Sequence, residues 1–128
     1  MIQFYLCKTA EQYLLCQKLQ KRVEGHSDPL GFPTVYGVSP EGRIIGFTST
    51  STEYGVVISG PTVIDPYFTP RLKYGQEQIK AHESALRSFG VTEYLFSVRK
   101  DNTKMLQAVS ELTAYDEDED CYWYKRTI

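Results

Sequence analysis

The chain has 128 residues, of which 41% are hydrophobic and 23% are charged, as is typical of one globular domain with a single core. The formal net charge of −2 gives the whole chain no electrostatic reason to bind nucleic acid, and no apolar run approaches the roughly 20 residues that cross a bilayer. The three cysteines lack a Cys-x-x-Cys spacing, which argues against a disulfide framework and a zinc site. We expect a single domain spanning 1–128 without a metal. Residues 1–8 lack the pattern of a secretory signal, so we expect a cytoplasmic protein.

The first elements are a short strand at 2–6 and an amphipathic helix at 10–24. Thr9 and Gln12 form a capping box at the start of this helix, and Gly25 ends it. The apolar face is expected to consist of Leu15, Leu19 and Val23.

Three strands follow the first helix. Residues 34–38 and 43–50 predict a hairpin, and residues 56–64 predict a third strand. Pro61 interrupts this third strand and cannot donate a ladder hydrogen bond, so the sheet is expected to open or bulge at Gly60-Pro61.

The second half predicts a long helix at 71–89 and a strand at 91–98. A shorter helix capped by Asp101 or Thr103 and a closing strand at 121–126 complete the order. The face of the long helix is expected to consist of Leu72, Gly75, Ile79, His82, Leu86 and Phe89. Five consecutive carboxylates at 116–120 predict a solvated turn rather than a metal site.

The expected fold class is therefore α/β (α+β), with a mixed, mostly antiparallel sheet in the order β-α-β-β-β-α-β-α-β. The unit at 55–89 runs from a strand through a loop into a helix N-terminus, which is a potential anion site because the first N–H groups of a helix lack partners. Arg71 and Lys73 add positive charge there, and Gly75 allows a ligand to approach the backbone.

This order and several local strings resemble the GNAT acyltransferase superfamily. The string EGRIIGF at 41–47 resembles its second and third strands with their turn, and IDP at 64–66 resembles the end of its fourth strand. Asn102 matches the asparagine that opens the next helix of the family. The resemblance covers about residues 33–128, and it implies direct transfer of an acyl group from acetyl-coenzyme A to a small-molecule or protein amine.

The resemblance also implies site residues. Asp65 is the expected base for the amine proton, with Glu53 and His82 as alternatives. The family often uses a tyrosine to protonate the departing thiolate, and Val109 stands at that position here. Tyr115 is therefore the expected acid in its place. The implied coenzyme A contacts are Val63, Ile64, Arg71, Lys73, Tyr74, Gly75, Gln76 and Asn102.

The cofactor loop departs from the family pattern. Small residues are expected at 74 and 76, where Tyr74 and Gln76 would crowd a pyrophosphate. An inactive GNAT-like module that binds a protein partner is therefore the alternative, whereas net acidity argues against an enzyme that modifies nucleobases. Free sheet edges make a homodimer an additional expectation.

Overall fold

The computed structural model describes residues 2–68 and 71–128. The elements are β1 (Gln3–Leu6), α1 (Ala10–Glu24), β2 (Val35–Val38), β3 (Ile44–Glu53), β4 (Val56–Ile64), α2 (Arg71–Ser88), β5 (Glu93–Arg99), α3 (Thr103–Ala108), β6 (Asp116–Glu117) and β7 (Cys121–Thr127). The predicted order and fold class are confirmed, with the two-residue strand β6 as an addition.

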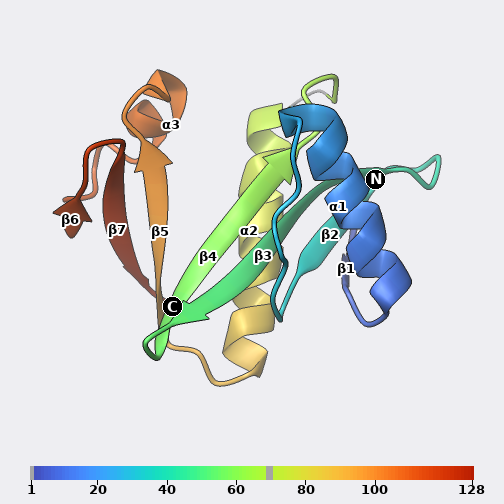
Figure 1. Cartoon of the computed structure of the whole chain (residues 1–128), viewed down its shortest axis with the longest axis horizontal. Coiled ribbons are helices and arrows are strands. Elements are labelled where there is room, and N and C mark those ends of the chain that lie inside the picture. The colour runs from blue at the N-terminus through green and yellow to red at the C-terminus, as the bar shows by residue number, and fades with distance from the viewer. Residues whose placement is uncertain (1, 69–70) are drawn as a thin grey trace.

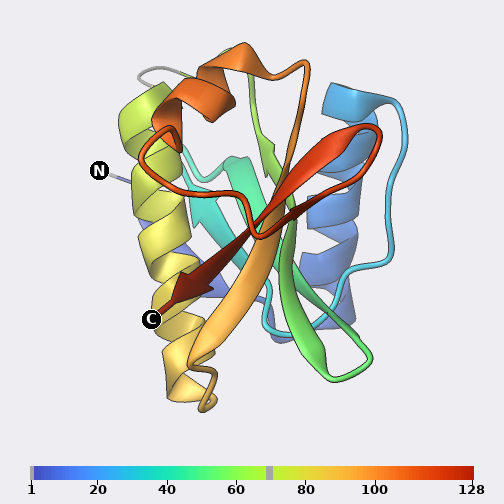
Figure 2. The same ribbon diagram turned by 90° about the vertical axis from the view of Figure 1, so that its left-hand side faces the viewer.

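The strands form one sheet in the order β1-β2-β3-β4-β5-β7-β6. Every neighbouring pair is antiparallel except β4 and β5, which are parallel and are joined through α2. Helix α1 covers one face of the sheet and α2 the other (Figures 1 and 2). The sheet therefore lies between two helical layers, with β4 and β5 next to each other near its middle.

Helix α1 has the predicted bounds because both of its caps form. Thr9 Oγ1 accepts the N–H of Gln12, the Gln12 side chain accepts the N–H of Thr9, and Gly25 adopts the left-handed conformation. The predicted apolar face is partly wrong, since Leu15 is 44% exposed. The buried line instead runs through Cys16, Leu19 and Gln20.

The hydrophobic core has two parts. On the α1 face a cluster joins α1 to the first four strands, and it consists of Cys7, Cys16, Leu19, Tyr36, Phe47 and Val63. A smaller cluster under α3 consists of Val98, Val109 and Tyr124. Within residues 2–68 and 71–128, none of the helices combines the length and apolar character that crossing a bilayer requires.

Strand β4 bulges where the sequence predicts it. Thr48 pairs with Thr62 and Thr50 with Ser59, so one residue of β3 lies opposite Gly60 and Pro61 together. The predicted bulge is confirmed, and it divides β4 into two halves.

Candidate functional site

Strands β4 and β5 pair at a single position and then diverge. Ile58 lies opposite Leu95, whereas β4 continues to Ile64 and β5 to Arg99. Figure 1 shows the two arrows separating toward their carboxyl ends. One edge of β4 beyond the bulge is therefore left without a neighbouring strand.

The open edge carries backbone groups of Thr62 and Ile64. Asp65 donates its N–H to the carbonyl of Ile45 at 2.8 Å, so residue 65 faces β3. Because successive residues of a strand face opposite neighbours, Thr62 and Ile64 direct their N–H and C=O groups away from β3, toward β5. Thr62 is a residue that the sequence reasoning missed.

Val63 is a predicted cofactor contact whose placement argues against that role. Its side chain is buried in the α1-face core at 2% exposure, and its backbone faces Phe47 on β3. In contrast, Ile64 directs its backbone groups away from β3, and its half-buried side chain lies against Gly75 of α2.

Asp65 ends β4 and shapes the loop that follows. Its carboxylate accepts the N–H of Tyr67 at 2.9 Å and lies 3.4 Å from Arg22 Nη2, while its carbonyl accepts the N–H of Phe68 at 3.1 Å. The side chain is 1% exposed. A general base must reach the proton that it removes, so this burial argues against the predicted role of Asp65 as a base and indicates a loop anchor.

The loop leads directly into α2, which begins at Arg71. The side chain of Arg71 lies outside the described residues. Lys73 and Gln76 are exposed in the first two turns. The unpaired N–H groups of the first turn and the positive end of the helix dipole, together with Lys73, favour an anion there.

Tyr74 does not crowd this helix end, contrary to the sequence prediction. Its side chain is 2% exposed and lies on the sheet, where its hydroxyl donates to Gln78 Oε1. A Cβ added at Gly37 or Gly46 would lie 2.3 or 2.6 Å from this hydroxyl. Gly37 and Gly46 lie opposite each other on neighbouring strands. Glycines in such positions often indicate a side chain packed closely on the sheet, so this pair could have predicted the contact.

Gly75 has a packing function that the sequence did not reveal. A Cβ at this position would lie 3.3 Å from Ile64 Cδ1. The glycine thus allows α2 to approach β4 closely, immediately beside the open edge of the strand.

His82 supports the bulge from the α2 side. Thr50 donates its hydroxyl to the carbonyl of Pro33 at 2.7 Å, so it accepts the N–H of His82 Nε2, also at 2.7 Å. His82 Nδ1 then accepts the hydroxyl of Ser59 at 3.5 Å. Burial lowers the pKa of His82 to about 4, and the ring is neutral at pH 7. The geometry makes His82 a support for the strand rather than an exposed base.

The fold as a whole recurs in solved structures. The ribosomal-protein-S18-alanine N-acetyltransferase from Escherichia coli is 13% identical with a TM-score of 0.75, covering 100% of this chain and 94% of that one. Ard1 from Thermoplasma volcanium is 14% identical with a TM-score of 0.74, covering 99% and 97%. The PaiA N-acetyltransferase from Thermoplasma acidophilum, in complex with coenzyme A, is 13% identical with a TM-score of 0.66, covering 93% and 72%.

This chain has the GNAT fold. No family model and no curated protein matches its sequence. The GNAT fold is therefore evident from the three-dimensional arrangement, at a sequence identity too low for sequence comparison to detect.

Two further predicted site residues lie on the β5 side of the GNAT fold. Asn102 caps α3 by accepting the N–H of Met105 at 3.2 Å, so the predicted caps Asp101 and Thr103 are wrong. Tyr115 is 61% exposed, with Lys125 Nζ 5.2 Å from the centre of its ring. Tyr115 lines a depression of about 200 Å³ together with Val57 and Leu95, directly beside the position where β4 and β5 pair.

Glu53 completes the predicted candidates. It ends β3 and is exposed in the turn before β4. That placement is the ordinary one for a turn carboxylate, and nothing in its surroundings gives it a partner for proton transfer.

Proposed function

We propose that this chain is an acyl-coenzyme-A-dependent N-acyltransferase that transfers an acetyl group directly to a small-molecule or protein amine. The observation that carries the proposal is the open edge of β4 at Thr62 and Ile64, which continues through the Asp65 loop into the N-terminus of α2. The GNAT fold and the coenzyme A complex of the PaiA neighbour support it.

The chemistry of the site fits coenzyme A. Amide-bearing chains pair with an exposed strand edge through backbone hydrogen bonds, and Thr62 and Ile64 offer such an edge for the pantetheine arm. The first turn of α2 offers N–H groups for the pyrophosphate. Arg71 and Lys73 add positive charge there, and Gln76 follows in the second turn. Tyr74 and Gly75 would contribute through their backbone, and Asn102 lies at the start of the neighbouring helix α3.

Acetyl-coenzyme A supplies an activated acyl group, and the residues of the chain would orient it and stabilise charge. The Thr62 N–H directly follows the bulge and faces the gap, so we assign it as donor to the thioester oxygen as negative charge develops there. Tyr115 provides the exposed hydroxyl beside the pairing of β4 and β5, and we assign it as the acid for the departing thiolate. Asp65 holds the loop. The proton that the attacking amine loses would pass to water, from which Tyr115 would be reprotonated.

Thermal stabilisation by acetyl-coenzyme A tests the binding half of this proposal. A ligand at 100 times its Kd stabilises the folded state by about 2.7 kcal/mol. We expect a clear upward shift in Tm for the wild type, a smaller shift for Lys73→Glu and a wild-type shift for Lys80→Glu, an exposed control on the same helix. No shift at millimolar ligand would contradict the proposal and favour the inactive, partner-binding module.

Release of free thiol during incubation with a panel of amines tests the chemical half. Tyr115→Phe should lower kcat about 10²-fold or more while leaving the acetyl-coenzyme A shift in Tm unchanged. An unchanged kcat would show that another group protonates the thiolate.

A further inference from the structure

A shallow depression of about 430 Å³ lies between α1 and the turn that joins β2 to β3. Its seven lining residues carry positive or no charge, and they are Leu15, Lys18, Leu19, Arg22, Gly42, Arg43 and Ile44. We call this depression the basic groove. It lies beside α1 and the β2–β3 turn, whereas the proposed coenzyme A site lies between β4, β5 and α2. The ion pair between Arg22 of the groove and Asp65 of the cofactor loop connects the two.

The cations of the basic groove are available to a ligand. Lys18 and Arg43 are exposed and make no ion pair among the described residues. Arg22 is 54% exposed, and Asp65 at 3.4 Å holds its guanidinium in place. Lys18, Arg43 and Arg22 thus surround the groove, and none of its lining residues is acidic.

The turn that carries Arg43 is held by hydrogen bonds. Ser39 donates its N–H to the carbonyl of Arg43 at 2.9 Å, and Ser39 Oγ accepts the N–H of Arg43 at 3.2 Å. Gly42 has a φ of +85° and donates to the carbonyl of Ser39. These hydrogen bonds order the backbone of the turn that presents Arg43 opposite α1.

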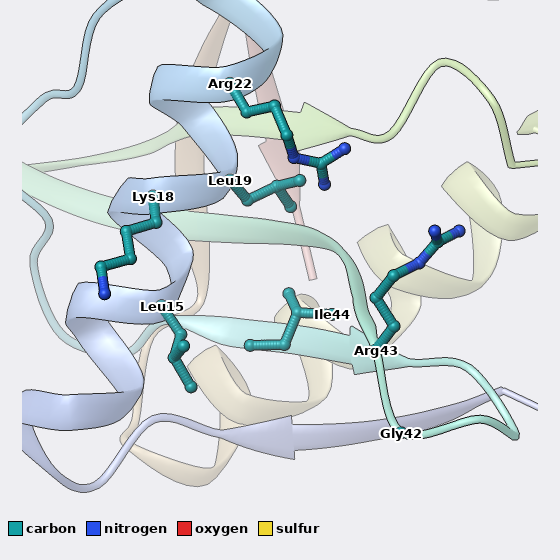
Figure 3. A pocket seen from close by; sticks show the side chains of 7 residues that line it. All are labelled: Leu15, Lys18, Leu19, Arg22, Gly42, Arg43 and Ile44. Atoms are coloured by element: carbon teal, nitrogen blue, oxygen red, sulfur yellow. The ribbon is translucent and has the colours of Figure 1, made fainter.

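The base of the groove is aliphatic. Figure 3 shows Leu15, Leu19 and Ile44 between Lys18 on one side and Arg22 and Arg43 on the other. Leu15 is 44% exposed, so it offers apolar surface next to Lys18 at one end of the groove (Figure 3). Such a combination fits a ligand that has both carboxylates and an aliphatic side chain.

We propose that the basic groove binds an acidic peptide segment of a protein partner, with an aliphatic side chain against Leu15 and Ile44. Cations on opposite rims match carboxylates spaced along a chain better than a single compact anion. The groove has no aromatic side chain on which a base could stack, which disfavours single-stranded nucleic acid. The proposal does not rest on the proposed acyl transfer.

Fluorescence anisotropy with a labelled peptide of sequence Asp-Glu-Leu-Asp-Glu-Leu tests the proposal. We expect saturable binding that weakens when salt is raised from about 20 to about 200 mM, and at least about tenfold weaker binding by Lys18→Glu/Arg43→Glu. The double variant Lys80→Glu/Lys104→Glu makes the same charge change on α2 and α3 and should bind like the wild type. Equal loss in both double variants would overturn the proposal.

Two further probes test its chemistry. The neutral peptide Asn-Gln-Leu-Asn-Gln-Leu should bind at least about tenfold more weakly, and Leu15→Ser should lose the preference for Leu over Ala at the aliphatic positions. Equal affinity for both peptides would contradict the role of the cations. A thymidine oligonucleotide that binds as tightly as the acidic peptide would replace the proposed partner with nucleic acid.

A second copy of this chain is the remaining occupant to test, because residues 116–120 are themselves acidic. Sedimentation velocity at low salt should show the same oligomeric state for the wild type and for Asp116→Asn/Glu119→Gln/Asp120→Asn. Self-association that disappears in Asp116→Asn/Glu119→Gln/Asp120→Asn would show that the acidic turn of another copy fills the groove, and would overturn the proposal of a separate partner.

Discussion

At the residue scale, the hydrogen bonds of His82 determine both its tautomer and its response to pH. The ring donates to Thr50 and accepts from Ser59, next to the bulge of β4. A protonated ring would need to donate at both nitrogens in a site with little solvent. Protonation therefore opposes the folded arrangement that positions the open edge of β4.

We predict that stability falls as the pH is lowered from about 6.5 toward 4. The pKa of His82 is about 4 in the folded state, below its unfolded value near 6.5, so the unfolded chain binds the extra proton between these values. The free energy of unfolding should drop by up to about 1.4 kcal/mol per pH unit, measured by urea denaturation. His82→Gln should flatten this dependence. An NMR titration midpoint of the His82 ring at or above 6 would contradict the prediction.

Tyr74 makes a second prediction at this scale. Gly37→Ala would place a Cβ 2.3 Å from the Tyr74 hydroxyl and 3.0 Å from Phe4, and overpacking of this kind costs about 1–3 kcal/mol. Removing the hydroxyl in Tyr74→Phe should recover part of the cost in the double variant. Denaturant unfolding of the four proteins in a cycle measures this coupling, and strictly additive costs would show that the two side chains do not compete for space.

At the element scale, α2 is tied to β5 and β7 by a buried carboxylate. Glu83 is 2% exposed, accepts the Tyr94 hydroxyl at 2.6 Å and is paired with Arg126. Burial alone raises the pKa of Glu83, but the hydrogen bonds from Arg126 and Tyr94 outweigh it and hold the pKa below its ordinary value. The helix is therefore anchored to the second half of the sheet by a charged contact.

We predict that Arg126→Met destabilises the fold more than the double variant Arg126→Met/Glu83→Gln. The single variant leaves a buried carboxylate without its cation and should cost about 1–3 kcal/mol, since Arg126 itself is half exposed. The double variant replaces that charge with a neutral acceptor for Tyr94. Thermal and urea unfolding compare the two, and a larger loss in the double variant would contradict the prediction.

The elements differ in how well the sequence predicted them. The bounds of α1 and the bulge at Pro61 follow from local signals, namely a capping box and a residue without an N–H. The face of α2 was predicted only in part. His82 and Leu86 are buried as expected, and the side chain of Leu72 lies outside the described residues. The buried residues Tyr74, Gln78 and Glu83 were missed, because their contacts depend on residues far along the chain. Gln78 donates to Thr48 at 2.9 Å and His82 to Thr50, whereas Phe89 is 52% exposed and stacks edge-on against Phe32.

In the candidate site, too, some features were predictable from the sequence and others were not. The position of the strand–loop–helix unit was predictable from the order of elements. The directions of side chains were not, because alternation along β4 buries Val63 and because Asp65 turns inward to Arg22. Thr62 was missed because its proposed role belongs to its backbone N–H. Almost every residue has this group, so the residue type does not indicate the role.

At the scale of the whole molecule, the sheet consists of two packed parts that meet where β4 and β5 pair. The α1-face cluster belongs to β1–β4 and the α3 cluster to β5–β7. The pairing of Ile58 with Leu95 and the Glu83 contact connect them. The smaller part has fewer buried residues with which to resist local opening.

We predict that amides of β5 and β7 exchange with solvent at lower opening free energies than those of β2 and β3. Native-state hydrogen exchange followed by NMR measures the difference. Arg126→Met should lower protection in β5 and β7 while leaving β2 and β3 close to the wild type. A uniform loss across the sheet would instead indicate one cooperative unit.

The short length and negative charge of β6 affect whether the sheet can extend into another molecule. Strand β6 is the outer strand of the sheet, spans only Asp116–Glu117 and runs into three further carboxylates. A strand from another chain that paired with β6 would find two residues and an adjacent run of negative charge. The acidic turn thus disfavours fibre-like growth through β6, whereas β1, the outer strand at the other edge, carries no such run of charge.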